Sequence, residues 1–120
     1  MGNYKGFEDL DIWKEGIDFS VEVYKVFKEC KDFGLKDQIQ RASVSIPSNI
    51  AEGYERQTDK ELIQFLYIAK GSCGEVRTQL IIAQKTRIID ENNSTILIQQ
   101  SKILSSKILN FIKYIKSRPN

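Results

Sequence analysis

Hydrophobic residues recur at intervals of three or four along most of the chain, which is the spacing of one face of an α-helix. Four segments carry this pattern, at about 9–31, 35–52, 58–89 and 94–117, and short polar stretches separate them. The one β-leaning run, "TRII" at 86–89, stands at a helix end. Because short connections favour antiparallel neighbours, the 120 residues are predicted to form a single all-α domain, an up-and-down four-helix bundle with long helices.

The first segment carries two adjacent apolar stripes. One stripe comprises Leu10, Trp13, Ile17, Val21, Tyr24 and Phe27, and the other comprises Ile12, Phe19, Val23, Val26 and Cys30. A single stripe is enough to pack a helix into a monomeric bundle. The additional stripe therefore predicts self-association.

The other three segments each show one apolar face, which predicts the core. In the second segment the face comprises Leu35, Ile39, Ala42, Ile46 and Ile50. In the third it comprises Leu62, Phe65, Leu66, Ala69, Cys73, Val76, Leu80 and Ala83. In the last segment a strict heptad spacing joins Leu97, Ser101, Leu104, Ile108, Phe111 and Ile115.

Capping residues and glycines mark the expected helix ends. Short polar side chains accept hydrogen bonds from the free N–H groups of a first turn, and glycine readily adopts the left-handed conformation that stops a helix. The expected caps and stops are Asp9, Gly34, Gly53, Thr58 with Glu61 as a capping box, and Asn93 or Ser94.

The segment "RASVSIPSNIAEG" at 41–53 gathers polar residues around a proline. Pro47 lacks an N–H and clashes with the preceding turn, so the second helix is predicted to kink or restart there. One polar face comprises Gln38, Arg41, Ser45, Ser48 and Glu52. Arg41 and Glu52 lie about 16 Å apart along a helix, so each needs another partner. Glu75 and Arg77 are available, and a buried ion-pair network is a more economical interpretation than catalysis.

The segment "KGSCGE" at 70–75 places two glycines inside the third helix, well past its start. A phosphate-binding glycine loop lies outside a helix or at its first turn, so this site is not predicted. Interior glycines cost about 1 kcal/mol each relative to alanine. We therefore interpret Gly71, Ser72 and Gly74 as a crossing point where a neighbouring helix approaches closely.

Composition removes several chemistries. The chain has no histidine, which excludes histidine acid–base catalysis, and its two cysteines cannot form a structural zinc site within one chain. Cys30 and Cys73 are expected to be reduced. No cofactor or metal is predicted, and the absence of a signal sequence or a long apolar run predicts a cytoplasmic protein without a membrane span.

The net charge of +2 is unevenly distributed. Residues 8–37 carry nine acids and five bases, whereas residues 94–120 carry five bases and no acid. A nucleic-acid-binding surface is therefore hypothesised at Lys102, Lys107, Lys113, Lys116 and Arg118, with Arg56 and Lys60 in addition. The alternative is a solvated face, or pairing with the acidic first helix. Aromatic residues fall mostly on the apolar stripes, so no base-stacking platform is indicated. Tyr4, Phe7 and Tyr54 are the exceptions, and packing in the core or at an interface is favoured over exposure for them.

Three separated motifs resemble one protein family. They are "FEDLDIWKEG" at 7–16, "GLKDQIQRASVSIPSNIAEG" at 34–53 and "FLYIAKGSCGEVRTQL" at 65–80. Together they resemble the bacterial four-helix-bundle proteins encoded in 23S ribosomal RNA intervening sequences. The resemblance implies a homopentameric barrel without enzymatic activity, related to accessory proteins of diversity-generating retroelements, which bind a reverse transcriptase and nucleic acid. It also implies structural or interfacial roles for Trp13, Gln38, Arg41, Ser45, Asn49, Glu52 and Glu75.

Three functional hypotheses result. The first is a non-enzymatic homo-oligomer that associates with structured RNA through its basic residues. The second is a protein-interaction scaffold, or an accessory subunit for a protein partner such as a polymerase. The third is an enzyme that uses carboxylate or lysine chemistry in a pocket around Glu52 and Glu75, and the lack of histidine disfavours it.

Overall fold

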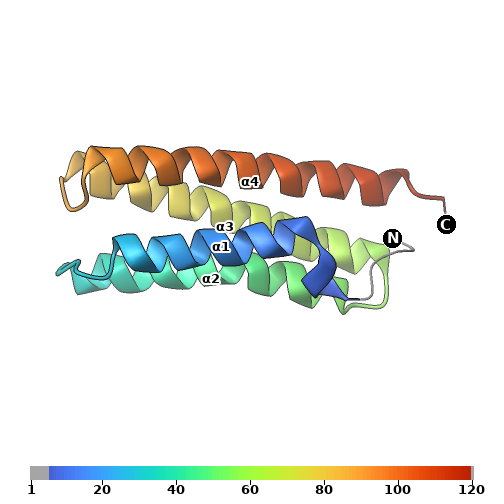
Figure 1. The fold of residues 1–120 in the computed structure, drawn as a ribbon. Coiled ribbons are helices and arrows are strands. Elements are labelled where there is room, and N and C mark those ends of the chain that lie inside the picture. The colour runs from blue at the N-terminus through green and yellow to red at the C-terminus, as the bar shows by residue number, and fades with distance from the viewer. Residues whose placement is uncertain (1–5, 120) are drawn as a thin grey trace.

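The computed structural model describes residues 6–119 as an elongated bundle of helices (Figure 1). A short 3-10 turn, η1 (Phe7–Asp9), precedes α1 (Asp11–Val26), α2 (Phe33–Tyr54), α3 (Asp59–Lys85) and α4 (Glu91–Ser117). Successive helices run in opposite directions along the long axis (Figure 1). The bundle measures 49 × 20 × 19 Å. The predicted all-α four-helix fold is confirmed.

Each helix packs against two neighbours, in the pairs α1–α2, α2–α3, α3–α4 and α1–α4. Within residues 6–119 the diagonal pairs make no close backbone contact. The four helices therefore enclose one central core, and every helix keeps an outer face. The described grooves open between α1 and α4, α1 and α2, and α3 and α4, and these grooves and the outer faces are where a partner can be bound.

The apolar faces predicted for the last three helices form this core. Their fully buried members are Ile39, Ile46, Ile50, Leu66, Ala69, Cys73, Val76, Leu80, Ala83 and Ile108, with Leu97, Leu104 and Ile115 almost completely buried. Leu35, Phe65 and Phe111 are half-buried at its margin. The heptad spacing of α4 thus predicts the correct inward face, including the buried hydroxyl of Ser101.

Of the two stripes of α1, one lies in the core, and the other is buried only at Leu10 and Phe27, which flank the helix. Ile12, Phe19 and Val23 lie in the core, whereas Ile17, Val21 and Tyr24 of the other stripe are 37%, 45% and 44% exposed. A helix in a four-helix bundle has about one face to bury, so the second stripe remains on the surface. The excess of apolar residues in α1 is therefore not used inside this chain.

The starts of the first two helices differ from the predicted ones. Asp9 lies in η1, and α1 begins after Leu10 without a side-chain cap, so the prediction of Asp9 as the cap is wrong. Helix α2 begins after Asp32, whose Oδ1 accepts the N–H of Leu35 at 3.0 Å. Gly34 is therefore in the first turn of α2 and does not stop the preceding helix. Apolar periodicity alone does not show which nearby carboxylate forms a cap.

Two caps define the junction between α3 and α4, one at the carboxyl-terminal end of α3 and one at the amino-terminal end of α4. Arg87 adopts the left-handed conformation with φ 61°, and the N–H groups of Arg87 and Ile88 bond back to Gln84 and Ala83. This Schellman motif ends α3 at Lys85 instead of 89. Asp90 caps α4 by accepting the Asn93 N–H at 2.7 Å, so the expected caps Asn93 and Ser94 are wrong.

The Asp90 cap also has an electrostatic signature. Hydrogen bonds from the backbone and side chain of Asn93 hold the pKa of the Asp90 carboxyl below its ordinary value. A carboxyl with a lowered pKa in the folded state stabilises the fold above its ordinary pKa, and this contribution is lost as the pH falls.

The start of α3 confirms the predicted cap at Thr58, whose hydroxyl accepts the N–H of Glu61 at 3.2 Å.

Helix α2 runs without interruption from Phe33 to Tyr54, with Pro47 inside it. The helix does not restart at the proline, and the predicted kink stays a prediction. Pro47 is buried against α1 at Gly16, where an added Cβ would lie 3.4 Å from the proline ring. A methyl group here would be in van der Waals contact with the ring, so the position leaves little room for a side chain larger than alanine.

Gly53 does not end α2 but lies inside its last turn, buried against α3. A Cβ at this position would lie 2.7 Å from the Cβ of Phe65 and 3.2 Å from the carbonyl oxygen of Leu62. Real Cβ atoms do not approach that closely, so α2 and α3 would have to separate. Gly53 is the closest helix–helix approach among the described glycines.

We predict that Gly53→Ala lowers the free energy of unfolding by about 1–3 kcal/mol, because the new methyl group overpacks the α2–α3 contact. Gly74→Ala is the matched control. A Cβ there meets no atom within 4 Å, so the variant should gain about 0.5–1 kcal/mol from helix propensity. Denaturant titration followed by circular dichroism measures both. Equal effects of the two substitutions would contradict the assigned contact.

Candidate functional site

The polar face predicted on α2 does not form a buried ion-pair network. The side chain of Arg41 is 80% exposed, and its Nε bonds to Asp37 Oδ2 one turn earlier at 2.9 Å. Glu52 pairs in the same way with Arg56 at 3.0 Å. Gln38 is also exposed. Each charged group thus finds its partner within its own helix, since residues four apart are neighbours on a helix surface.

Ser45 is the member of this face that contacts another helix. Its hydroxyl lies 2.7 Å from the hydroxyl of Ser72 on α3, and its carbonyl oxygen accepts the side-chain N–H of Asn49 at 2.7 Å. Ser45, Asn49 and Ser72 therefore form a small polar contact across the α2–α3 interface. The predicted buried network is therefore reduced to this contact and several separate surface pairs.

The structure does not bring Glu52 and Glu75 together. Ser45 faces Ser72 and Gly53 faces Phe65, so Glu52 lies level with about residue 65 of α3. Glu75 is about 15 Å farther along the axis, where it is exposed and accepts a hydrogen bond from Gln79. Neither carboxylate lines the grooves between α1 and α2, α1 and α4, or α3 and α4. The predicted two-carboxylate pocket is absent from these described grooves.

Hydroxyl groups connect three of the four helix interfaces. The contacts are Ser20 with Ser43 at 2.9 Å, Ser45 with Ser72 at 2.7 Å, and Arg77 Nε with Ser101 Oγ at 2.9 Å. These small polar side chains satisfy one another within an apolar core, so burying them does not leave unpaired groups. At the fourth interface an ion pair joins Lys107 of α4 to Glu15 of α1.

The two interior glycines of α3 do not lie at a helix crossing within the chain. A Cβ at Gly71 or at Gly74 would meet nothing within 4 Å. Ser72, between them, is the residue that faces α2. The prediction of a crossing point is therefore correct for Ser72 and wrong for the two glycines in this chain. The close approach that glycine permits occurs instead at Gly16 and Gly53.

Four of the predicted basic residues are engaged within the bundle. Lys107 pairs with Glu15 and Arg56 pairs with Glu52. Lys116 lies over the ring of Tyr67, and Arg118 forms an ion pair with Asp59 at 2.8 Å. Arg118 lies just beyond the end of α4, so helical spacing no longer applies to it, and its side chain turns to α3. The alternative of pairing with the acidic first helix is correct for Lys107.

Lys102 and Lys113 remain exposed, and they form no ion pair within residues 6–119. They are eleven residues apart, so they share one side of α4 at a separation of about 16 Å. Lys116 follows one turn after Lys113 and meets α3 at Tyr67. This side of α4 is therefore the one that adjoins α3.

Helix α3 contributes two further cations to the same outer face. Arg77 is level with Ser101, to which it donates two hydrogen bonds, and Lys70 lies two turns earlier on the same side of α3. We name the resulting surface the cationic face. Its members are Lys70, Arg77, Lys102, Lys113 and Lys116. The sequence analysis missed Lys70 because a single lysine between apolar residues carries no signal until the packing of α3 against α4 is known.

No acidic residue lies between the members of the cationic face, and Asp59 and Glu91 stand at its two ends. Helices α3 and α4 together carry eight bases and four acids. Three of the acids stand in the first turns, where they complement the helix dipole, and Glu75 is the one acid in a helix middle. Glu75 is two residues from Arg77 and so lies on a different side of α3. The cationic face is therefore an uninterrupted positive strip.

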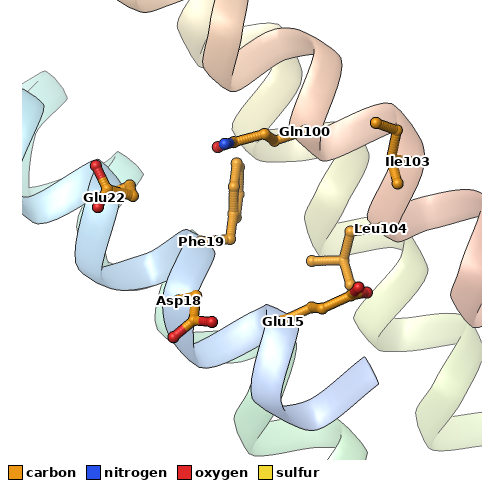
Figure 2. A pocket seen from close by; sticks show the side chains of 7 residues that line it. All are labelled: Glu15, Asp18, Phe19, Glu22, Gln100, Ile103 and Leu104. Atoms are coloured by element: carbon orange, nitrogen blue, oxygen red, sulfur yellow. The ribbon is translucent and has the colours of Figure 1, made fainter. Parts of the chain in front are cut away.

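The opposite charge gathers at the groove between α1 and α4. Figure 2 shows Glu15, Asp18 and Glu22 following α1 along one side, with Gln100 and Ile103 of α4 on the other. The groove has a volume of about 220 Å³ and a floor formed by Phe19 and Leu104. The charge asymmetry of the sequence thus appears in three dimensions as an acidic side and a basic side of one bundle.

The groove between α1 and α2 is apolar. It has a volume of about 300 Å³ and no charged side chain lines it. Its lining residues are Trp13, Ile17, Ser20, Val21, Val44, Pro47, Ser48 and Ala51. The exposed stripe of α1 forms one wall of this groove. An exposed apolar surface that runs along two helices is typical of a protein contact.

The thiol of Cys73 is unsuited to nucleophilic chemistry. Burial raises the pKa of the Cys73 thiol to about 11, with the nearby charges of Arg77 and Lys70 opposing part of this effect. Cys73 is therefore protonated at neutral pH and a poor nucleophile. No cluster of three or more cysteine, aspartate or glutamate side chains in residues 6–119 is arranged to hold a metal ion.

The two described aromatic residues outside the apolar stripes are partly packed, as favoured, and other aromatic residues are exposed. Phe7 and Tyr54 are half-buried, and Tyr4 lies outside the described residues. Tyr67 and Tyr114 are each 45% exposed, near the end of the bundle where α4 finishes. Tyr67 follows Leu66 and therefore lies off the apolar stripe of α3, which is the signal that predicts its exposure.

The described chain is thus a four-helix bundle with one cationic face, one acidic side and one apolar groove. Residues 8–110 match the family described as 23S rRNA-intervening sequence protein, and the chain belongs to this family. A crystal structure of a protein of unknown function from the S23 ribosomal protein family of Bacteroides thetaiotaomicron is similar in fold. The TM-score is 0.79 at 25% identity, over 85% of this chain and 98% of that chain. No curated protein gives a significant match.

The family membership confirms the resemblance that the three motifs indicated. The polar motif residues have structural surroundings: Ser45 joins α2 to α3, Asn49 bonds to the Ser45 carbonyl within α2, and Arg41 and Glu52 pair along the surface. No helix within residues 6–119 is both long enough and apolar enough to cross a bilayer.

We predict that Arg77→Met lowers the free energy of unfolding by about 1–2 kcal/mol, because it removes charged hydrogen bonds to the buried Ser101. Arg41→Met is the matched control. It removes an exposed pair one turn apart and should cost no more than about 0.5 kcal/mol. Urea titrations of both variants give the comparison. If Arg41→Met costs as much as Arg77→Met, Arg41 has a contact beyond its own helix.

Proposed function

We propose that the protein is a non-enzymatic RNA-binding bundle that contacts the sugar–phosphate backbone through its cationic face. The observation that carries this proposal is the positive strip formed by α3 and α4 with no acid between its members. Lys102 to Lys116 span fourteen residues of α4, or about 21 Å, which is long enough to follow several successive phosphates. Backbone contacts of this kind depend on charge and shape and carry little sequence information.

The form of the strip fits structured RNA. Helices α3 and α4 run side by side, so the cations occupy two parallel rows, with Arg77 and Lys70 on one and Lys102 and Lys113 on the other. Such a ridge can lie across a groove of an RNA duplex and contact phosphates on both sides of it. The family description, which refers to 23S rRNA intervening sequences, supports RNA as the partner.

Self-association is the second part of the proposal. We propose that a second copy of this chain occupies the apolar groove between α1 and α2. The apolar groove between α1 and α2 requires a largely apolar partner surface. The outer face of α3 offers Ile68 and Ile82, which are 51% and 49% exposed, and open space beside Gly71. Glu75 lies on the same face between the two isoleucines, so its carboxylate borders the contact. Glycine at that point allows a neighbouring backbone to approach closely, which accounts for its position inside a helix.

This contact leaves the cationic face free. Ile68 and Ile82 lie nine and five residues from Arg77, so they point to the other side of α3. A contact between two different surfaces repeats from copy to copy and closes into a ring when the rotation permits. A homopentamer, which the family resemblance implies, is one such ring. Several cationic faces on one assembly would multiply weak phosphate contacts.

We predict that Lys102→Gln/Lys113→Gln weakens binding to 23S rRNA fragments and lowers the slope of log K against log salt by about 1 for each lost contact. The matched control is Lys14→Gln/Lys25→Gln, which removes two exposed lysines from α1. Fluorescence anisotropy at several salt concentrations measures both variants. Wild-type protein that is folded and binds no RNA at low salt would exclude the function. Equal loss in both variants would exclude the assigned surface.

We predict that the wild-type protein is a homo-oligomer and that Val21→Glu dissociates it, because a charge would enter the apolar groove. Gly71→Gln should have the same effect by preventing close approach, while each single chain stays folded. Ile96→Glu, an equally exposed apolar position on α4, is the control that should remain assembled. Light scattering after size exclusion gives the masses. A monomeric wild type, or variants that all stay assembled, would contradict this interface.

A further inference from the structure

A separate groove lies at the end of the bundle where α3 begins and α4 finishes. It has a volume of about 520 Å³, within the range of small-ligand sites. The lining residues are Asp59, Lys60, Ile63, Gln64, Tyr67, Ile115, Lys116 and Arg118. The groove thus combines an aromatic ring, an apolar floor, an amide and three cations that come from two helices.

The ring of Tyr67 is held in place and remains accessible. Lys116 Nζ lies 5.3 Å from the ring centroid and donates to the phenol oxygen at 3.3 Å, while the side chain is 45% exposed. One lysine therefore fixes the orientation of the ring and puts a positive charge beside it. An aromatic ring with an adjacent cation fits a nucleotide, whose base stacks and whose phosphate is negative.

The charges of the groove leave it net positive. Asp59 is the one lining acid, and Arg118 pairs with it at 2.8 Å. The side chain of Arg118 is 22% exposed and its guanidinium lies 5.8 Å above the ring of Tyr114, so its position is fixed from two sides. Lys60 forms no ion pair with any described residue. Lys60 and Lys116 therefore provide positive charge for an anion.

From this geometry we infer that the groove binds one unpaired nucleotide of an RNA. The base stacks on Tyr67, the adjoining phosphates contact Lys60 and Lys116, and the Gln64 amide faces the edge of the base. Gln64 is exposed on the same turn as Ile63 and is suited to hydrogen-bond a base edge, since an amide both donates and accepts.

This inference rests on the proposed function, because the groove adjoins the cationic face through Lys116. An RNA stem that lies on Lys102 and Lys113 would direct its end or loop toward the groove. A paired base is stacked within its helix and has no free face for Tyr67, whereas an unpaired base does. The groove therefore adds a preference for an RNA with an unpaired end or loop over a fully paired one.

The test compares two labelled RNA duplexes of the same paired sequence, each annealed from two strands so that neither has a loop, one blunt and one with a three-nucleotide 3′ overhang. Fluorescence anisotropy at low salt should show about tenfold tighter binding of the overhang RNA by wild-type protein. Tyr67→Leu should reduce that affinity to the level of the blunt RNA and leave blunt binding unchanged. Tyr67→Phe keeps the ring and should keep the preference. Tyr24→Leu, which changes an equally exposed tyrosine on α1, is the control.

A second measurement reports the contact directly. With 2-aminopurine in the overhang, wild-type protein and Tyr67→Phe should quench its fluorescence by stacking, and Tyr67→Leu should not. Lys60→Gln should weaken binding of the overhang RNA severalfold without abolishing the quenching, and it tests the groove if Tyr67→Leu is poorly folded.

The outcomes separate the two proposals. Folded wild-type protein that binds neither RNA at low salt overturns the proposed function and the nucleotide groove together. Binding of both RNAs with equal affinity by wild-type protein overturns the groove alone. A Tyr67→Leu protein that keeps both the preference and the quenching also overturns the groove and leaves the cationic face in place.

Discussion

The close approach of α2 to α3 is the contact on which the rest of the bundle depends. Gly53 lets the last turn of α2 lie directly against Phe65, and the hydroxyls of Ser45 and Ser72 meet two turns farther along. These two contacts fix the register of the two helices, because a shift by one residue would place a side chain where only glycine fits. With that register set, the predicted apolar faces of α2, α3 and α4 meet in one core.

The same register determines which surface charges lie together. Because α3 and α4 are antiparallel and Arg77 is level with Ser101, lysines distant in sequence form one strip, while the acids of α1 line the groove on the other flank of α4. A bundle has little interior space for a reactive site, since its core is filled with apolar side chains. Its chemistry is therefore expressed on faces and grooves, which suits binding to long, charged or apolar partners better than catalysis.

Sequence periodicity predicted the inward positions of α2, α3 and α4 well because burial follows helical spacing directly. It predicted helix ends less well. Asp9, Gly34 and Asn93 were plausible markers, but Leu10, Asp32 and Asp90 occupy the cap positions. Several polar residues near each end compete for the same role, and the tertiary contacts of the following turn decide between them. Gly71 and Gly74 of α3 show the same limit. The stability that glycine costs a helix indicates a compensating contact but does not show where that contact lies.

The sequence by itself determined the four helices, their apolar faces, the excess apolar stripe of α1, the family and the separation of charge between the two ends of the chain. These properties are local or compositional, so spacing and residue type are sufficient to reveal them. Only the tertiary structure decided which polar groups are paired and which are available. Arg118 turns to Asp59, Lys107 is bound by Glu15, and Lys70 joins Lys102 and Lys113 because pairing depends on the rotation and register of neighbouring helices, which no single helix specifies.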